Sequence, residues 1–339
     1  MNSLSQSYSR QRLPRIKKIS GRKVKRDIFY VLITCVCLAV IIAILARPER
    51  YTAACAEAVA LWAQCVLPAL FPFMVVCSLL IASGAAEKIS RQFGWLCKRA
   101  KLPSCAPVCI LLGLLSGYPA GARNVTLFYE SGETDSRGAE KLAFICTACG
   151  PVFLAGTVGA GMFASAAIGA KLIAAHLAAV LFTGVILALM GKKSQPTSRE
   201  ICAVQMNNAN ILEECFFGSV KSALTAGAFI AFFYTLSAMA EDYCLLMPAE
   251  KIFMLFTDEA TAHAAARGLI EMTGGCAALA KAGSPFSVPL AGFLVTSGGL
   301  CVLFQQLSYL TKAGVNSLKF VAVKIVQGVL CFAILLAIY

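Results

Sequence analysis

Charged residues are scarce in this sequence, and histidine is almost absent. Asp, Glu, Lys and Arg make up 14% of the 339 residues, whereas soluble domains contain about 25%. The two histidines, His176 and His263, stand far apart, and neither has a triad-like or metal-ligand pattern around it. No glycine-rich loop of the P-loop type occurs. These absences argue against a soluble domain and against an enzyme, and we predict no cofactor and no metal site.

Apolar residues dominate instead, at 59% of the chain, with a mean hydropathy of +0.76. A membrane-spanning helix needs about 20 such residues. The stretches that are long enough are Ile28–Ala46, Ala58–Ala86, Leu172–Met190, Ser222–Ala240, Phe286–Thr311 and Phe320–Tyr339, with Leu142–Ala170 as a further candidate interrupted by glycines. The composition predicts an all-α polytopic membrane protein of about eight membrane segments.

Glycine, proline and polar residues interrupt the apolar sequence at three places. The first is Leu111–Arg123, which ends in an arginine, and the others are Thr147–Phe153 and Thr296–Leu300. Non-helical backbone inside a membrane is tolerated where it is buried in protein or lines a water-filled cavity. We therefore expect these breaks to mark a binding site.

Prolines argue against a simple helix in two of the apolar segments. Pro68 and Pro72 predict that Ala58–Ala86 is two half-helices or one sharply kinked helix. The segment Pro103–Ala122 carries three prolines and three glycines between basic residues. It fits a re-entrant hairpin at least as well as a full crossing.

The second half of the chain holds similar interrupted segments, Ala262–Ala282 and Leu290–Leu300. The pattern Leu-Leu-Ser-Gly-Tyr of the first half resembles Val-Thr-Ser-Gly-Gly of the second, although such glycine-rich patterns also arise by chance. Corresponding broken segments in two halves indicate a transporter built as an inverted repeat. We predict a basic arm at 1–27 and a membrane domain at 28–339, with halves at 55–190 and 215–339.

The net charge of +13 is concentrated at the N-terminus. Nine of the 30 Lys and Arg lie between Arg10 and Arg26. This arm predicts a cytoplasmic N-terminus and contact with anionic lipid, and we expect no nucleic-acid partner. The basic loop Glu87–Lys101 and the acidic loop Glu241–Glu259 agree with that orientation.

Most of the 16 cysteines stand singly inside apolar stretches and are typical of small buried side chains. One Cys-x-x-Cys pair occurs, at Cys146 and Cys149. A redox or metal role for this pair has no second pair and no nearby histidine to support it.

Charged side chains inside apolar segments are costly and often functional. Arg123 is either an anion ligand or an anchor at the membrane interface, whereas Lys171 and Lys221 favour the interface. Glu271 is either a site residue or the partner of Arg267 four residues before it. Glu271 is also our candidate for coupling to H⁺ or Na⁺.

Half-helices that begin inside the membrane present unpaired N–H groups, which attract anions, and Arg123 adds a forked cation. We therefore predict a small anionic or heterocyclic solute as substrate. The candidate substrate-binding residues are Ser116, Gly117, Tyr118, Arg123, Asn124, Thr147, Gly150, Glu271, Thr273, Ser297, Gly298 and Gln305.

The motifs at 116–123 (Ser-Gly-Tyr-Pro-Ala-Gly-Ala-Arg), 149–163, 270–275 (Ile-Glu-Met-Thr-Gly-Gly) and 297–302 also resemble a known family. They look like the YlbJ-type sporulation integral membrane proteins, of the nucleoside-recognition or Gate-domain group, which is similar to parts of concentrative nucleoside transporters. The resemblance covers about 55–335. The chain departs from the pattern in being shorter and in having Arg123 where we expect lysine.

The resemblance implies a multi-pass protein of a bacterial cell membrane, acting in the mother-cell membrane around the developing spore. It also implies a role in moving dipicolinate, a pyridine dicarboxylate, although a nucleoside would use a similar pocket. A membrane scaffold for spore envelope assembly, without transport, is the alternative. The sequence leaves the oligomeric state open.

Overall fold

The computed structural model describes residues 21–83, 88, 92–191 and 210–339. The chain divides into two compact units, Met1–Glu49 and Arg50–Tyr339. The first unit contains helix α1 (Gly21–Ala46), whose described side chains are mostly exposed and apolar, as expected for lipid contact. Most of the predicted basic arm and part of the loops used to predict orientation lie outside the described residues, so the domain bounds and the orientation stay predictions.

The second unit confirms the all-α prediction, because every regular element among the described residues is a helix. Its first half contains α2 (Pro48–Leu61), η1 (Trp62–Val66), α3 (Leu67–Ala82), α5 (Gly94–Arg99), α6 (Ala106–Ser116), α7 (Ala120–Glu130), α8 (Ser136–Cys146), η2 (Phe153–Met162) and α9 (Ala166–Met190). Its second half contains α10 (Ile211–Asp242), α11 (Met247–Phe253), α12 (Glu259–Ile270), α13 (Met272–Ala282), α14 (Ser287–Ser297), α15 (Gly299–Leu310), η3 (Thr311–Ala313) and α16 (Ser317–Ile338).

Among the described residues, five helical segments are long and apolar enough to cross a membrane, which confirms the polytopic class. They are Pro48–Leu79, Ala166–Met190, Ile211–Asp242, Ser287–Ala313 and Ser317–Ile338. The apolar helices α6 and η2 are shorter. At 1.5 Å per residue an 11-residue helix is about 16 Å long, roughly half of the hydrocarbon thickness.

Of the two alternatives for Ala58–Ala86, two half-helices are wrong, because the described part remains one continuous helix. A kinked helix stays a prediction. The five residues Trp62–Val66 form a π-helical turn directly before Pro68. A wider turn leaves room for a proline ring and a missing N–H, so the helix continues where a regular α-turn would clash.

A hairpin of two short helices, α6 and α7, is present, but its bounds differ from the predicted Pro103–Ala122. That range contains the first arm and the turn, and the second arm continues to Glu130, so Arg123 lies near the turn and not at the base. Gly117, with φ of 67°, ends α6, and α7 begins at Ala120. Helices α12 and α13 form a second hairpin, which turns at Glu271.

The other two predicted breaks are also present. The backbone is not helical at Thr147–Gly150, between α8 and the segment that leads into η2. Gly298 and Gly299 both have positive φ, 89° and 56°, and they separate α14 from α15.

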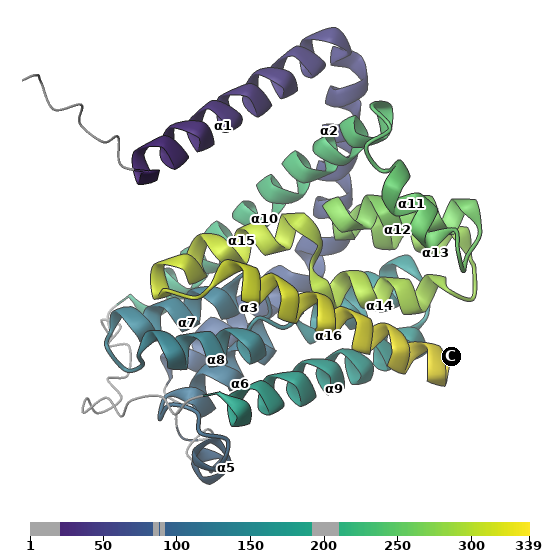
Figure 1. Ribbon diagram of the computed structural model, residues 1–339. Coiled ribbons are helices and arrows are strands. Elements are labelled where there is room, and N and C mark those ends of the chain that lie inside the picture. Colours follow the sequence, from purple (N-terminus) through teal and green to yellow (C-terminus); the bar gives the residue numbers. More distant parts are fainter. Residues whose placement is uncertain (1–20, 84–87, 89–91, 192–209) are drawn as a thin grey trace, which may run out of the picture. The chain divides into compact units, whose positions relative to one another are not determined.

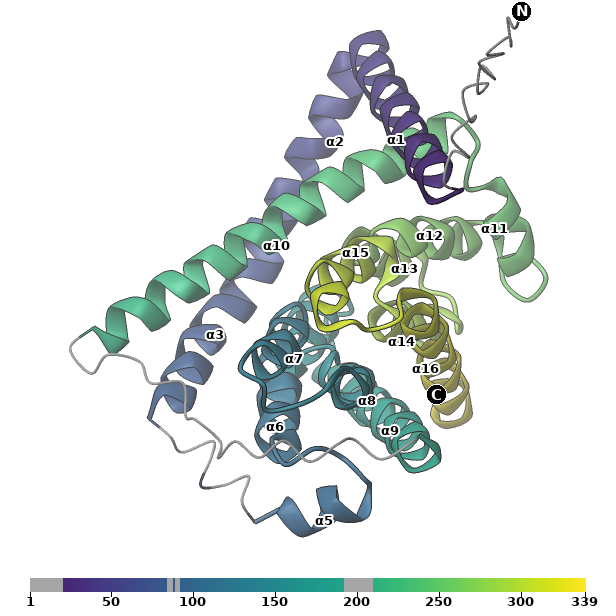
Figure 2. The ribbon, with the colours of Figure 1, turned by 60° about the vertical axis from the view of Figure 1, so that its left-hand side comes forward.

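The order of elements repeats in the two halves. Each half has a long helix (α3, α10), a hairpin (α6–α7, α12–α13), a broken helix (α8–η2, α14–α15) and a second long helix (α9, α16). The packing repeats as well, since α7 packs on α15 while α13 packs on η2. Figure 2 shows α3 and α10 on one side of the group formed by the hairpins and broken helices.

Corresponding helices run in opposite directions. The start of α2 meets the end of α10, where Arg50 Nε lies 2.9 Å from Asp242 Oδ1. At the other end Ser78 Oγ lies 3.4 Å from Ser219 Oγ. The start of α9 likewise meets the end of α16, since Lys171 Nζ donates to the Ile338 carbonyl. Helices α9 and α16 lie side by side in Figure 1, and the repeat is inverted.

One detail of the predicted repeat needs correction. The similar patterns ending at Tyr118 and Gly299 do not occupy equivalent positions. The turn at Gly117 corresponds to the hairpin turn at Glu271, and the break at Thr147–Gly150 corresponds to Gly298. Helices often end at a glycine with positive φ. Helix ends that are not equivalent in the repeat can therefore have similar sequences.

Glycines let the hairpin backbones touch. A Cβ atom on Gly121 of α7 would overlap the Cys146 carbonyl oxygen of α8. In the second hairpin a Cβ on Gly275 would overlap Gly268 Cα, across the two arms. Any larger side chain at either place would push the helices apart.

Candidate functional site

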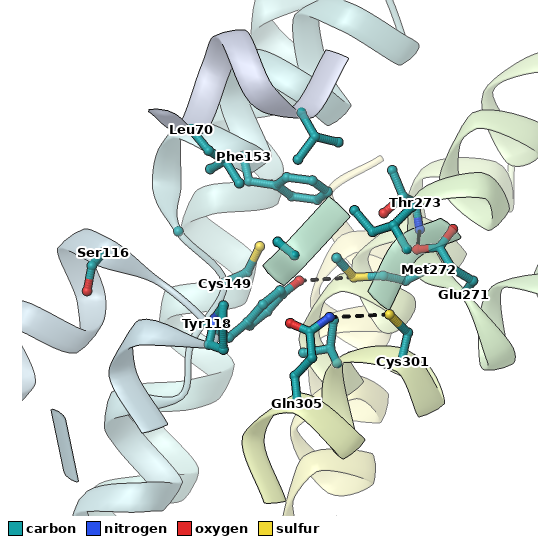
Figure 3. A pocket seen from close by; sticks show the side chains of 16 residues that line it. Leu70, Ser116, Tyr118, Cys149, Phe153, Glu271, Met272, Thr273, Cys301 and Gln305 are labelled. Carbon is teal, nitrogen blue, oxygen red and sulfur yellow. Dashed lines mark hydrogen bonds between the residues drawn. The ribbon is translucent and has the colours of Figure 1, made fainter. Parts of the chain in front are cut away.

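The two hairpin turns, the first helix break and the start of α15, which follows the second break, surround one cavity (Figure 3). Its lining residues are Val66, Leu70, Ser116, Tyr118, Pro119, Cys149, Gly150, Phe153, Ala226, Ile230, Glu271, Met272, Thr273, Cys301, Val302 and Gln305. The long helices α3 and α10 supply the side that is purely apolar. The cavity volume is about 40 Å³, room for roughly one water molecule.

The first hairpin turn is held against the first break. A Cβ on Gly117 would lie 2.5 Å from Gly150 N, so the two backbones are in direct contact. Next to it, the Tyr118 hydroxyl donates to Met272 Sδ at 3.0 Å and lies 3.3 Å from the Val295 carbonyl oxygen. Tyr118 thereby joins the first hairpin to the second half, as Figure 3 shows.

The second hairpin turn is organised by Glu271. Its carboxylate accepts hydrogen bonds from Thr273 N at 2.9 Å and Gly274 N at 2.7 Å, so it caps the N-terminus of α13. The residue is 1% exposed. Arg267, the alternative partner, lies with its Nε 3.3 Å from Glu241 Oε1 instead. Glu271 is therefore bound mainly by backbone N–H groups.

Thr273 places a hydroxyl in the wall of the cavity, next to the Glu271 carboxylate. The residue is 1% exposed, and its Oγ1 atom makes no hydrogen bond of ordinary geometry among the described residues. Buried polar atoms are normally paired, so an unpaired one in the wall of a cavity marks a place where a ligand or water would bind. Gln305 also lines the cavity, and its Nε2 lies 3.4 Å from Cys301 Sγ.

Side chains of helices α9 and α16 form hydrogen bonds with the backbone of the first break. Cys149 N donates to His176 Nε2 at 2.8 Å, and His176 Nδ1 lies 2.8 Å from Thr296 Oγ1. Because Nε2 accepts, the ring proton is on Nδ1 and points to Thr296, so His176 links the break to α14.

The carbonyl groups at the end of α8 bind side chains of α16. Lys324 Nζ donates to the Thr147 carbonyl at 2.5 Å, and Gln327 Nε2 donates to the Phe144 carbonyl at 2.8 Å. Lys324 is 1% exposed. A cation at a helix C-terminus stabilises its free carbonyl groups. The sequence reasoning missed Lys324, although a lysine within the predicted span Phe320–Tyr339 is a visible signal.

The structure brings together six of the twelve candidate residues: Ser116, Tyr118, Gly150, Glu271, Thr273 and Gln305 all line the cavity. Gly117 supports it through Gly150. The hydroxyls of Thr147 and Ser297 bond to carbonyls of their own helices, Ala143 and Phe293, and Gly298 ends α14.

Arg123 and Asn124 do not line the central cavity. Both lie on α7, which runs from the hairpin turn towards its base, and Arg123 is exposed and lines a second cavity. The sequence reasoning also missed the sulfur and aromatic part of the central lining, namely Cys149, Phe153, Met272 and Cys301.

The described cysteines, Cys146 and Cys149 included, are free thiols. Within the described ranges, no group of three or more His, Cys, Asp or Glu side chains is placed to hold a metal ion. The chemistry available at the cavity is therefore hydrogen bonding, apolar contact and helix-terminus electrostatics.

No family model matches the chain. It is similar to the sporulation integral membrane protein YlbJ of Bacillus subtilis (strain 168), with 26% identity over 184 residues, which is 54% of this chain and 42% of that protein. This chain thus matches less than half the length of its curated relative. The expected resemblance is confirmed.

Among solved structures, the chain is similar to a variant of CNTnw, a concentrative nucleoside transporter, in the intermediate 1 state. The TM-score is 0.50 at 12% identity, over 96% of this chain and 88% of that one. The fold of this chain is similar to the fold of that transporter. The long apolar helices show that the chain is a multi-pass membrane protein, which is surrounded by a lipid bilayer.

Proposed function

We propose that this protein is a membrane transporter for a small anionic or heterocyclic solute. The observation that carries the proposal is that both hairpin turns, the first helix break and the start of α15, which follows the second break, line one cavity. A rigid scaffold has no need to bring four interrupted segments to one point, because interrupted helices cost backbone hydrogen bonds in a membrane. In transporters such interruptions bind the substrate.

The lining suits a small planar molecule. Tyr118 and Phe153 provide aromatic faces, and Thr273 and Gln305 provide hydrogen-bonding groups. A cavity of about 40 Å³ cannot hold a heterocycle, since ligand pockets are typically at least about 300 Å³. We infer that this conformation is closed and that the hairpins separate from the breaks when substrate enters.

Two substrates follow from this lining and the similarity to YlbJ and CNTnw. Dipicolinate is a planar pyridine with two carboxylates, and a nucleoside is a larger neutral heterocycle. We propose dipicolinate as the first candidate, moved across the mother-cell membrane around the forespore during sporulation. Coupling to H⁺ or Na⁺ through Glu271 belongs to the same proposal.

Uptake by the purified protein in liposomes tests this function, with radiolabelled dipicolinate and uridine as separate probes. We expect uptake of dipicolinate above that of protein-free liposomes. The Thr273→Val variant removes the hydroxyl that lines the cavity and keeps the side-chain shape. It should raise KM for uptake about fivefold to tenfold, which corresponds to about 1–1.5 kcal/mol for one hydrogen bond.

Thr183→Val is the matched control, because the Thr183 hydroxyl bonds within α9 to the Ala179 carbonyl and does not line the cavity. Its uptake should equal that of the unmodified protein. If neither probe is taken up under a pH or Na⁺ gradient, the transport proposal is wrong, and the non-transporting scaffold is favoured. If uptake is normal in both Thr273→Val and Glu271→Gln, the substrate does not bind at the second hairpin turn.

A further inference from the structure

A second cavity, of about 210 Å³, lies where α7, α10 and α15 meet. Its lining residues are Pro119, Ala120, Arg123, Gly218, Lys221, Ser222, Thr225 and Tyr309. Residues 218, 221, 222 and 225 follow one another at helical spacing, so a single face of α10 forms one wall. The opposite wall is the first turn of α7.

The charge of this cavity is entirely positive. Arg123 and Lys221 line it, and no acidic residue is among its lining residues. Neither cation takes part in any ion pair found in the described ranges. Lys312 Nζ adds a third positive charge nearby, 5.9 Å from the centre of the Tyr309 ring.

Neutral groups of the lining favour the same ligand. The first turn of α7 has no side-chain cap, but its Gly121 N–H already donates to the Gly117 carbonyl, so the ligand would be held by side chains. Tyr309 can donate a hydrogen bond from its hydroxyl. Two cations from different helices and a phenol together favour an organic anion with more than one negative charge.

The positive cavity adjoins the central one. A small intermediate cavity shares Pro119, Ala120 and Ser222 with the positive cavity, and it shares Ser116, Tyr118 and Pro119 with the central cavity. The three spaces therefore follow the first hairpin turn from Arg123 inward to Tyr118. A solute bound at Arg123 would have a short path to the central site along the gap between α7 and α10.

We propose that the cavity lined by Arg123 and Lys221 is an entrance site that binds the negatively charged groups of an organic anion before it passes to the central cavity. The inference rests on the proposed transport function and deepens it, since it makes the solute an anion. It also gives Arg123 a role at the mouth of the pathway instead of at its centre.

The experiment measures dipicolinate binding to the full chain in detergent by isothermal titration calorimetry, and uptake in phosphatidylcholine liposomes. We expect the double variant Arg123→Gln/Lys221→Gln to weaken binding and to raise KM for uptake at least tenfold. The maximal uptake rate should stay within about twofold. Arg123→Lys should recover most of the affinity, and 0.5 M salt should reduce the difference between the variants because it screens charges that are partly exposed.

Lys281→Gln is the matched control, since Lys281 is an exposed lysine that lines none of these cavities. Unchanged dipicolinate affinity in the double variant overturns the inference. The unmodified protein could bind dipicolinate without taking it up, and the double variant could lose that binding. This result would overturn the transport proposal but would support the anion site. If the effect of the double variant appears only in phosphatidylglycerol vesicles and is equal for dipicolinate and uridine, the cations bind a lipid headgroup, and the entrance role is overturned.

Discussion

At the scale of single residues, Gly117 shows how closely the hairpin turn and the helix break depend on each other. It ends α6 with φ of 67°, and its α-carbon faces the backbone of Gly150. Both requirements exclude a side chain: positive φ is unfavourable for residues other than glycine, and a Cβ would lie 2.5 Å from Gly150 N.

We predict that Gly117→Ala destabilises the protein by about 2–4 kcal/mol, combining backbone strain with overpacking. Thermal unfolding in detergent, followed by circular dichroism, measures the change. Gly218→Ala is the control, because the α10 helix leaves open space around that Cβ and alanine favours a helix. A melting temperature for Gly117→Ala equal to that of the control would contradict the observed contact.

Sequence reasoning at this scale identified six of the sixteen residues that line the cavity and placed Arg123 wrongly with respect to it. Ser116, Tyr118 and Gly150 are at the breaks themselves, where apolar sequence gives way to polar residues. Arg123 lies one helical turn further along α7, on a wall that faces α10. The sequence shows that a charged side chain is present, but it does not show which neighbouring helix that side chain faces.

At the scale of elements, the second hairpin begins with a capped helix. Asp258 accepts hydrogen bonds from Thr261 N at 2.9 Å and Thr261 Oγ1 at 2.7 Å, and so caps α12. These hydrogen bonds lower the pKa of Asp258 to about 2 from its ordinary value of 3.8. The ionised form therefore stabilises the hairpin.

The sign of the pH dependence follows from this lowered pKa. The stabilisation by Asp258 is present above pH 4, and it decreases as the pH falls from about 4 to about 2, where the carboxylate takes up a proton. An asparagine side chain at this position would still cap the helix but would not titrate. We predict that the melting temperature of Asp258→Asn is lower than that of the unmodified protein at pH 6.

Between pH 5 and pH 3 this difference in melting temperature should shrink, as measured by scanning calorimetry. The comparison isolates Asp258 because the other polar contacts of α12, such as that of His263 with Glu250, are the same in both proteins. A difference that stays constant over this pH range would show that the charge of Asp258 does not contribute to stability.

The elements themselves were largely predictable, because helix breaks leave clear marks in an apolar sequence. All three interruptions were predicted, and the first hairpin was predicted with its second arm too short. Pro68 does not divide the helix, since the effect of a proline depends on the turn before it. A π-helical turn at Trp62–Val66 precedes Pro68, and no sequence rule for single residues contains that geometry.

At the scale of the whole molecule, two inverted halves enclose a cavity too small for the proposed substrates. Cys149 comes from the first break and Cys301 from the second broken helix, so each half places one thiol in the lining. These thiols report on the opening of the cavity, since a reagent reaches them only when the hairpins move.

We predict that N-ethylmaleimide labels Cys149 and Cys301 slowly in liposomes and that saturating dipicolinate slows this labelling at least threefold. Peptide mass spectrometry quantifies each cysteine separately. Cys276 is the internal control, because it is completely buried on α13 and does not line the cavity. Equal labelling of Cys149 with and without dipicolinate would mean that the ligand does not occupy this cavity.

The assembly of the two halves was only partly predictable. The similar order of broken segments indicated a repeat. The similar sequence patterns ending at Tyr118 and Gly299, however, do not occupy equivalent positions in the two halves. The true correspondence depends on packing, in which α7 rests on α15 and α13 rests on η2. Contacts between residues far apart in the chain, such as Lys324 with Thr147, have no local pattern in a sequence.

The glycine contacts of the hairpins have a mechanical consequence. Gly121 touches the Cys146 carbonyl, and Gly275 touches Gly268, with no side chain in between. A side chain can change rotamer and absorb a small displacement, but a backbone in contact with a backbone cannot. The first hairpin would therefore move together with α8, and the two arms of the second hairpin would move together.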